Sequence, residues 1–103
     1  MGSDKPKHYQ KLQEMHPRLI EAAEALGAAA HDSGPLQEKD IQLVQLAASV
    51  AVRSEGAVRS HARRAVQAGA SMEEVRHAVI VLTATIGFPT VAAALDWLGK
   101  IED

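Results

Sequence analysis

Three side chains with different chemistry occur in residues 53–69 at positions that an α-helix would bring to one face. Ser54, Ala57 and His61 are spaced i, i+3 and i+7, and residues at such spacings share a helical face. An imidazole with an ordinary pKa near 6.5 suits general acid–base chemistry, and a serine hydroxyl becomes a nucleophile when a base activates it. On an unbroken helix, however, Ser54 and His61 would lie about 10 Å apart along the axis. A direct Ser–His pair therefore requires the chain to bend at Gly56.

His61 and Gln42 each have two interpretations. His61 is either a general acid or base held by an orienting partner, or a buried histidine whose ring is bonded to Gln42 or to a backbone carbonyl. We favour the second interpretation, because a histidine on an apolar face is more often a satisfied core residue. Gln42 is either an amide that lines a cavity or bridges two helices, or a glutamine that faces solvent. The sequence leaves both alternatives for Gln42 open.

A local basic cluster is formed by four arginines: Arg53, Arg59, Arg63 and Arg64. A guanidinium binds a carboxylate or phosphate with two parallel donors, so Arg59 and Arg63 are candidate ligand-binding residues for a small carboxylate. The alternative, which we favour, is ion pairing with acidic residues of a neighbouring helix or subunit.

The other histidines give no metal motif. None has the paired histidine and carboxylate support typical of a helical metal site; they are His8, His16, His31 and His77. The chain has no cysteine, which excludes thiolate ligands, thiol redox chemistry and disulfides. We therefore predict no metal site and no cofactor.

The elements that must position these side chains are all helical. Apolar residues recur at helical spacing through most of the chain, and no strand pattern occurs. The predicted helices cover residues 8–15, 17–30, 36–52, 55–68, 71–86 and 90–101. Pro17 starts one helix and Gly69 ends another, while Ser71 and Glu74 have the spacing of a capping box. The prediction is an all-α bundle of about five to six helices.

The length and composition of the chain are those of a small, alanine-rich domain. The chain has 103 residues, 47% of them hydrophobic, and a net charge of −2. Only Tyr9, Phe88 and Trp97 are aromatic, and the last two are expected in the core or at a subunit interface. A small bundle buries limited apolar area, which favours a homo-oligomer. The charge predicts neither a nucleic-acid nor a membrane partner. The start MGSDKPKHYQ lacks the apolar region of a signal peptide, so the expected location is cytoplasmic.

Residues 17–98 resemble the carboxymuconolactone decarboxylase family, the superfamily of AhpD-like alkylhydroperoxidases. The resemblance rests on H-x3-A-x3-G-x-[ST]-x2-E from His61 to Glu74 and on the later Gly-Phe-Pro before an alanine-rich helix. It implies an all-helical bundle that assembles into dimers, trimers or hexamers. We accordingly divide the chain into a partly helical segment, residues 1–14, and a family-like domain, residues 15–103.

The resemblance also places the family's active site, and the chain departs from it. The first cysteine position of the peroxidase branch is Ser54, the second is Ala57, and its glutamate position is Gln42; only His61 matches. The decarboxylase branch has a glutamate where this chain has Ala57. A peroxidase cycle needs one thiolate to attack and a second thiol to resolve. Peroxiredoxin-type activity is therefore expected to be lost.

Two functions remain. The first is a small-molecule-binding or structural homo-oligomer that has lost the redox residues. The second is a non-redox enzyme, such as a lactone decarboxylase, isomerase or hydrolase, in which His61 is the general acid or base and an arginine holds a substrate carboxylate.

Overall fold

A computed structural model describes residues 7–102 of the chain, and its contacts divide into two compact units. The first extends to Pro35 and the second begins at Leu36. The predicted boundary lies between residues 14 and 15, whereas the contacts divide about twenty residues later, in the loop that the Gly34-Pro35 pair predicts. The two units are described separately.

The first unit consists of two helices that pack on each other, α1 (Lys7–Met15) and α2 (Pro17–His31). Pro17 occupies the start of α2, where its missing N–H would have had no helical partner. The Tyr9 hydroxyl donates to a carboxylate oxygen of Glu24 at 2.8 Å and joins the two helices. Among the described residues of this unit only Ile20 is buried, so its core is very small.

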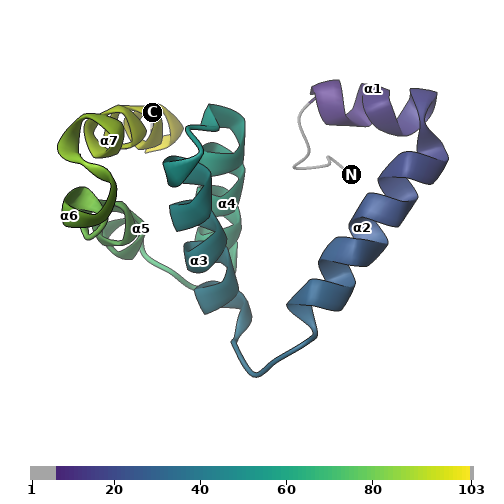
Figure 1. Ribbon diagram of the computed structural model, residues 1–103, viewed down its shortest axis with the longest axis horizontal. Helices are drawn as coiled ribbons and strands as arrows, with labels where there is room; N and C mark the ends of the chain where they lie inside the picture. Colours follow the sequence, from purple (N-terminus) through teal and green to yellow (C-terminus); the bar gives the residue numbers. More distant parts are fainter. Residues whose placement is uncertain (1–6, 103) are drawn as a thin grey trace. The chain divides into compact units, whose positions relative to one another are not determined.

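The second unit contains five helices: α3 (Glu38–Ala51), α4 (Glu55–Gln67), α5 (Met72–Ile80), α6 (Thr83–Ile86) and α7 (Phe88–Glu102). α4 packs along α3 and against α7, while α5 contacts α3 and α7 (Figure 1). The described residues contain no strand, and the all-α prediction is confirmed. Within the same residues, every helix is too short or too polar to cross a lipid bilayer.

The helix predicted over residues 71–86 is wrong in one respect, because it is two helices. α5 ends at Ile80, and a single-turn helix, α6, follows from Thr83. The Thr83 hydroxyl donates to the Ile80 carbonyl at 2.7 Å, so it takes an acceptor that a continuous helix would have used. Gly87, at φ 96°, ends α6, and α7 then starts at Phe88, two residues earlier than predicted.

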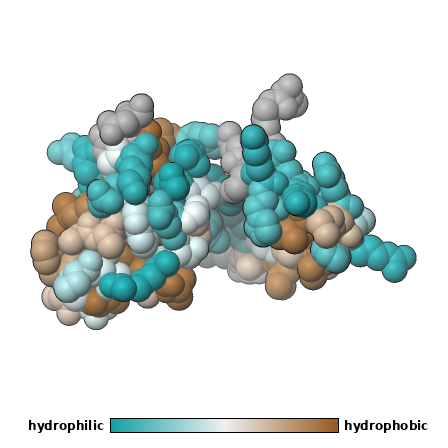
Figure 2. Space-filling view, turned by 90° about the horizontal axis from the view of Figure 1, so that it is seen from above, coloured by the Kyte–Doolittle hydropathy of each residue, from teal (hydrophilic) through white to brown (hydrophobic). Residues whose placement is uncertain are grey.

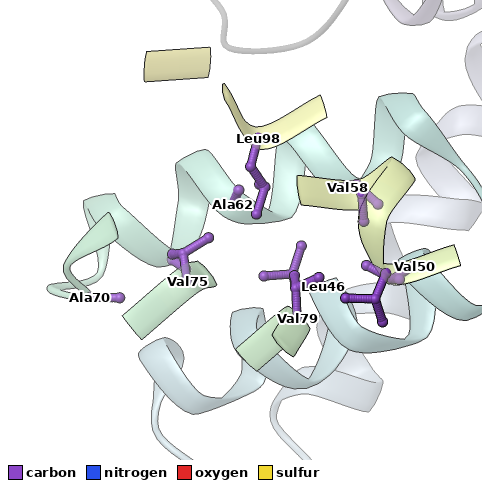
Figure 3. Packing of buried hydrophobic residues seen from close by; sticks show 11 residues of the cluster. Leu46, Val50, Val58, Ala62, Ala70, Val75, Val79 and Leu98 are labelled. Atoms are coloured by element: carbon purple, nitrogen blue, oxygen red, sulfur yellow. The ribbon is translucent and has the colours of Figure 1, made fainter. Parts of the chain in front are cut away.

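The core of the second unit is built from small and branched aliphatic side chains. Figure 3 shows Leu46 and Val50 of α3, Val58 and Ala62 of α4, and residues of α5 and α7 pointing into one shared space. Its buried members are Leu46, Val50, Val58, Ala62, Ala65, Ala70, Val75, Val79, Val91, Ala94 and Leu98. Trp97 packs against this cluster, half-buried, whereas Phe88 is 63% exposed. Phe88 is therefore not a core residue within the chain.

Candidate functional site

The connection between α3 and α4 fixes the start of the candidate site. The Arg53 N–H donates to the Val50 carbonyl and the Ser54 N–H to the Ser49 carbonyl, both at 3.0 Å. This pair of bonds is the Schellman pattern that closes a helix C-terminus, and it requires a left-handed residue. That residue is Arg53, at φ 59°, a conformation usually left to glycine because a Cβ is crowded there.

The guanidinium of Arg53 makes contacts that hold this turn against α7. Its Nη2 donates to the Thr90 hydroxyl at 2.9 Å and its Nε to the same oxygen at 3.3 Å. The end of α4 has the same Schellman bonds with the expected residue, Gly69, at φ 109°. The two turns therefore differ in that one uses a strained arginine whose side chain bonds to another helix.

Ser54 precedes α4 rather than lying within a helix that also carries Ala57 and His61, which corrects the prediction from the sequence. It is the N-cap of α4, with extended backbone (φ −98°, ψ 96°), and its side chain makes no capping hydrogen bond. α4 is one uninterrupted α-helix from Glu55 to Gln67 and includes Gly56, so no break at Gly56 brings Ser54 and His61 together. Ala57 is half-buried on α4 and offers only a methyl group.

Gln42 and His61, by contrast, are brought together. Nδ1 of His61 on α4 lies 2.8 Å from Oε1 of Gln42 on α3. Gln42 is only 4% exposed, so the solvent-facing interpretation of this residue is wrong, while His61 is half-buried. Gln42 lies one turn before the core residue Leu46, which places the pair at the margin of the apolar core.

A third residue, Glu38, completes a hydrogen-bonded series. The Gln42 Nε2 atom donates to Oε1 of Glu38 at 2.9 Å, one turn earlier on α3. Glu38 is not among the site residues predicted from the sequence. Its i, i+4 spacing from Gln42 on a predicted helix was the signal that could have found it, since such pairs are neighbours.

The charge state of His61 is set by its surroundings. Burial of the imidazole and, next, the positive charge of Arg64 hold the pKa of His61 below its usual value. Arg64 is exposed and lies three residues further along α4, so the two side chains are close on the helical surface. A buried imidazole beside a cation is stabilised in its neutral form, which can accept a proton.

The two arginines selected from sequence are placed differently. Nη2 of Arg59 lies 2.9 Å from a carboxylate oxygen of Glu55, one turn earlier on the same helix. Arg59 therefore forms an ion pair, the favoured interpretation, but its partner is on its own helix rather than on a neighbouring helix or subunit. Arg63 is exposed. Arg64 is the arginine whose positive charge lowers the pKa of His61. From the sequence alone it is only a member of the basic cluster.

The arrangement offers hydrogen-bonding and acid–base groups. Among the described residues, no set of three His, Asp or Glu side chains is placed to share a metal ion. No described polar side-chain atom that is fully buried lacks a hydrogen bond. The Gln42–His61 pair can hold a small polar molecule or move a proton through the imidazole.

Comparison with known proteins gives a family and one relative of undefined function. A family model described as the carboxymuconolactone decarboxylase family matches residues 17–100. An uncharacterized protein of Haemophilus influenzae is 38% identical over 59 residues, which are 57% of this chain and 52% of that protein. The chain therefore spans about half the length of this curated relative. The family match includes Gln42, Ser54, Ala57 and His61.

Proposed function

The chain belongs to the carboxymuconolactone decarboxylase family, and from this membership we propose that it is a small-molecule-binding homo-oligomer without thiol peroxidase activity. The second part of the proposal rests on residue type. The positions that resemble the peroxidase cysteines are Ser54 and Ala57. An alcohol and a methyl group cannot form and break a disulfide, which the peroxidase cycle requires.

The observation that carries the binding proposal is the Gln42–His61 hydrogen bond of 2.8 Å. A buried amide and a half-buried imidazole joined in this way form a polar group at the margin of an apolar core. A small number of convergent polar groups on an apolar surface is typical of small-molecule sites. The neighbouring charge of Arg64 favours a ligand that carries a carboxylate, because guanidinium and carboxylate groups are complementary.

A non-redox enzyme is the second candidate, and one observation favours it. The lowered pKa of His61, caused first by burial and then by Arg64, keeps the imidazole in the form that acts as a general base. A lactone decarboxylase, isomerase or hydrolase would use such a base together with an arginine that holds the substrate carboxylate. The two candidates share the same residues and differ only in turnover.

The homo-oligomer is supported by apolar side chains that the chain leaves uncovered. In the second unit Val44 is 58%, Val52 75% and Val81 57% exposed, and Figure 2 shows apolar residues at the surface. Burial of such side chains between subunits would add to the small core, since apolar area removed from water stabilises an assembly. The cytoplasmic location stays a prediction.

The test is a thermal-shift screen of wild type, His61→Ala and His77→Ala against carboxylated lactones, small hydroxy acids and hydroperoxides. His77 is an exposed histidine on α5 and serves as the matched control. A ligand at 100 times its Kd stabilises the native state by about 2.7 kcal/mol. We expect at least one compound to raise the melting temperature of wild type and of His77→Ala, and to leave that of His61→Ala unchanged.

Three results would count against the proposal. If no compound shifts wild type, and His61→Ala merely melts at a lower temperature, the pair has a structural role. If a compound that binds is also converted, the enzyme candidate replaces simple binding. Sedimentation velocity over a range of concentrations tests the assembly, and a monomer throughout would contradict the homo-oligomer.

A further inference from the structure

The buried amide of Gln42 lies between two partners with different hydrogen-bonding abilities. Its Nε2 is 2.9 Å from Oε1 of Glu38, and its Oε1 is 2.8 Å from Nδ1 of His61. A carboxylate only accepts hydrogen bonds, whereas an imidazole nitrogen either donates or accepts according to its tautomer. Glu38 is therefore the member of the series whose role as a hydrogen-bond acceptor is fixed.

Glu38 decides which end of the amide faces His61. If the amide were turned over, its oxygen would face the Glu38 carboxylate, and two acceptors would be opposed. At a residue that is only 4% exposed, such a loss leaves polar atoms unpaired and is costly. The NH2 group of Gln42 consequently points to Glu38 and its carbonyl oxygen to His61.

The orientation of the amide in turn decides which nitrogen of His61 carries the proton. The Gln42 Oε1 atom has no hydrogen to donate, so the short contact with Nδ1 is a hydrogen bond only if Nδ1 is protonated. A neutral imidazole has a single N–H. Nε2 is then the nitrogen with the free lone pair, as in other sites where the partner of one ring nitrogen sets the role of the other.

We propose that Glu38 is a positioning residue, which acts through Gln42 to hold His61 in the Nδ1-protonated tautomer and so makes Nε2 a hydrogen-bond acceptor and base. The ligand chemistry that this selects is a donor, such as the hydroxyl of a hydroxy acid, and this last step rests on the proposed function. The tautomer itself does not depend on any ligand.

The position of Glu38 suits this role. It is the first residue of α3, where the helix dipole favours a carboxylate, and it is one turn from Gln42, where i, i+4 side chains meet. The neighbouring cation, Lys39, is directed elsewhere, since its Nζ lies 3.4 Å from a carboxylate oxygen of Glu74. Glu38 is itself exposed, so substitution there leaves the apolar core unchanged.

The tautomer can be measured by long-range ¹H–¹⁵N NMR of the ¹⁵N-labelled full-length protein, without ligand, at a pH where His61 is neutral. Protonated and unprotonated ring nitrogens have widely separated ¹⁵N shifts, so the spectrum identifies the nitrogen that carries the proton. In wild type we expect Nδ1 to be protonated. In Glu38→Gln and Glu38→Ala the amide of Gln42 is free to turn, and the Nδ1-protonated form should lose its dominance.

Glu55→Gln is the matched control, because it removes an equal charge near the start of α4, where the carboxylate pairs with Arg59. Its His61 tautomer should equal that of wild type. A wild-type spectrum with Nε2 protonated, or Glu38 variants with an unchanged tautomer, would overturn the inference. Because no ligand is used, this failure is distinct from a thermal-shift screen that finds no binder.

Discussion

The carbonyl oxygen of Gln42 accepts a hydrogen bond from the His61 imidazole across the α3–α4 interface, at 2.8 Å. In the peroxidases that this chain resembles, the corresponding positions are a glutamate and a histidine. Here the two cysteine positions are Ser54 and Ala57. The packing of α3 on α4 therefore brings Gln42 and His61 into contact in a chain that has no thiols.

Gln42→Glu should raise the pKa of His61 relative to wild type. A carboxylate at this position faces Nδ1 and favours the charged imidazolium, because an opposite charge within hydrogen-bonding distance stabilises it. The measurement is an NMR titration of the His61 ring proton. Gln45→Glu, at an exposed position on the same helix, adds the same charge and should shift the pKa much less. Equal shifts in the two variants would show that Gln42 has no specific contact with His61.

The stability of the protein should fall as the pH is lowered through the range in which unfolded histidine becomes protonated. The pKa of His61 is lowered in the folded state by burial and by Arg64, so the unfolded chain binds the proton more readily. The contribution of neutral His61 is therefore complete above about pH 6.5, its unfolded value, and is lost as the pH falls toward the folded value. Urea unfolding of wild type and His61→Gln at pH 5.5 and 7.5 isolates this contribution. The pH-dependent loss should be smaller in the variant, and identical losses would contradict the assignment.

Arg53→Gly should be more stable than Arg53→Ala by about 1 kcal/mol, because glycine adopts the left-handed backbone without the crowding of a Cβ. Both variants lose the bonds to the Thr90 hydroxyl, so those bonds do not contribute to the difference between them. Chemical denaturation gives the free energies of unfolding. The side-chain bond is measured separately by a double-mutant cycle with Thr90→Ala. An alanine variant as stable as the glycine variant would mean that φ 59° at Arg53 carries no strain.

Ser71→Ala should cost about 1 kcal/mol of stability, the typical loss for an N-cap. The Ser71 hydroxyl accepts from the Glu74 N–H at 3.0 Å, and the Ser71 N–H donates back to the Glu74 carboxylate at 2.9 Å. That backbone bond, and next the charge of Lys39, hold the pKa of Glu74 below its usual value. Ser60→Ala within α4 is the control and should not destabilise the protein. Equal unfolding free energies for Ser71→Ala and wild type would disprove the capping role.

The double variant Ser54→Cys, Ala57→Cys should react with a hydroperoxide and form an internal disulfide. Residue 54 is the N-cap of α4, and a helix N-terminus lowers the pKa of a cysteine. One hydroperoxide would oxidise the two thiols to a disulfide and yield one alcohol and one water. Thiol titration and mass spectrometry should show the loss of two thiols per peroxide consumed. The single Ser54→Cys variant should stop at a sulfenic acid, and a double variant that also stops there would show that the two positions are not in reach of each other.

The helices were predictable from the sequence because their signals are local. Pro17, Gly69 and the Ser71–Glu74 box each act within one turn, and α2, α4 and α5 begin or end beside them. The break between α5 and α6 was missed because the hydroxyl of Thr83 competes with the helix for a carbonyl, which an apolar repeat does not reveal. The apolar repeat also does not reveal the left-handed turn at Arg53. That turn makes Ser54 the N-cap of α4 rather than a residue within a helix.

The all-α class follows from short-range periodicity in the chain, and the absence of thiols follows from its residue types. The family is shown by the match of a family model to residues 17–100. Which polar groups meet depends on the tertiary packing. His61 bonds to Gln42, 19 residues away, and Arg53 to Thr90, 37 residues away. Those contacts depend on how α3, α4 and α7 pack, and packing is set by the shared aliphatic core (Figure 3) rather than by any local pattern. The role inferred for Glu38 also depends on that packing. Its bond to Gln42 can set the tautomer of His61 only because α4 places His61 on the other side of the amide.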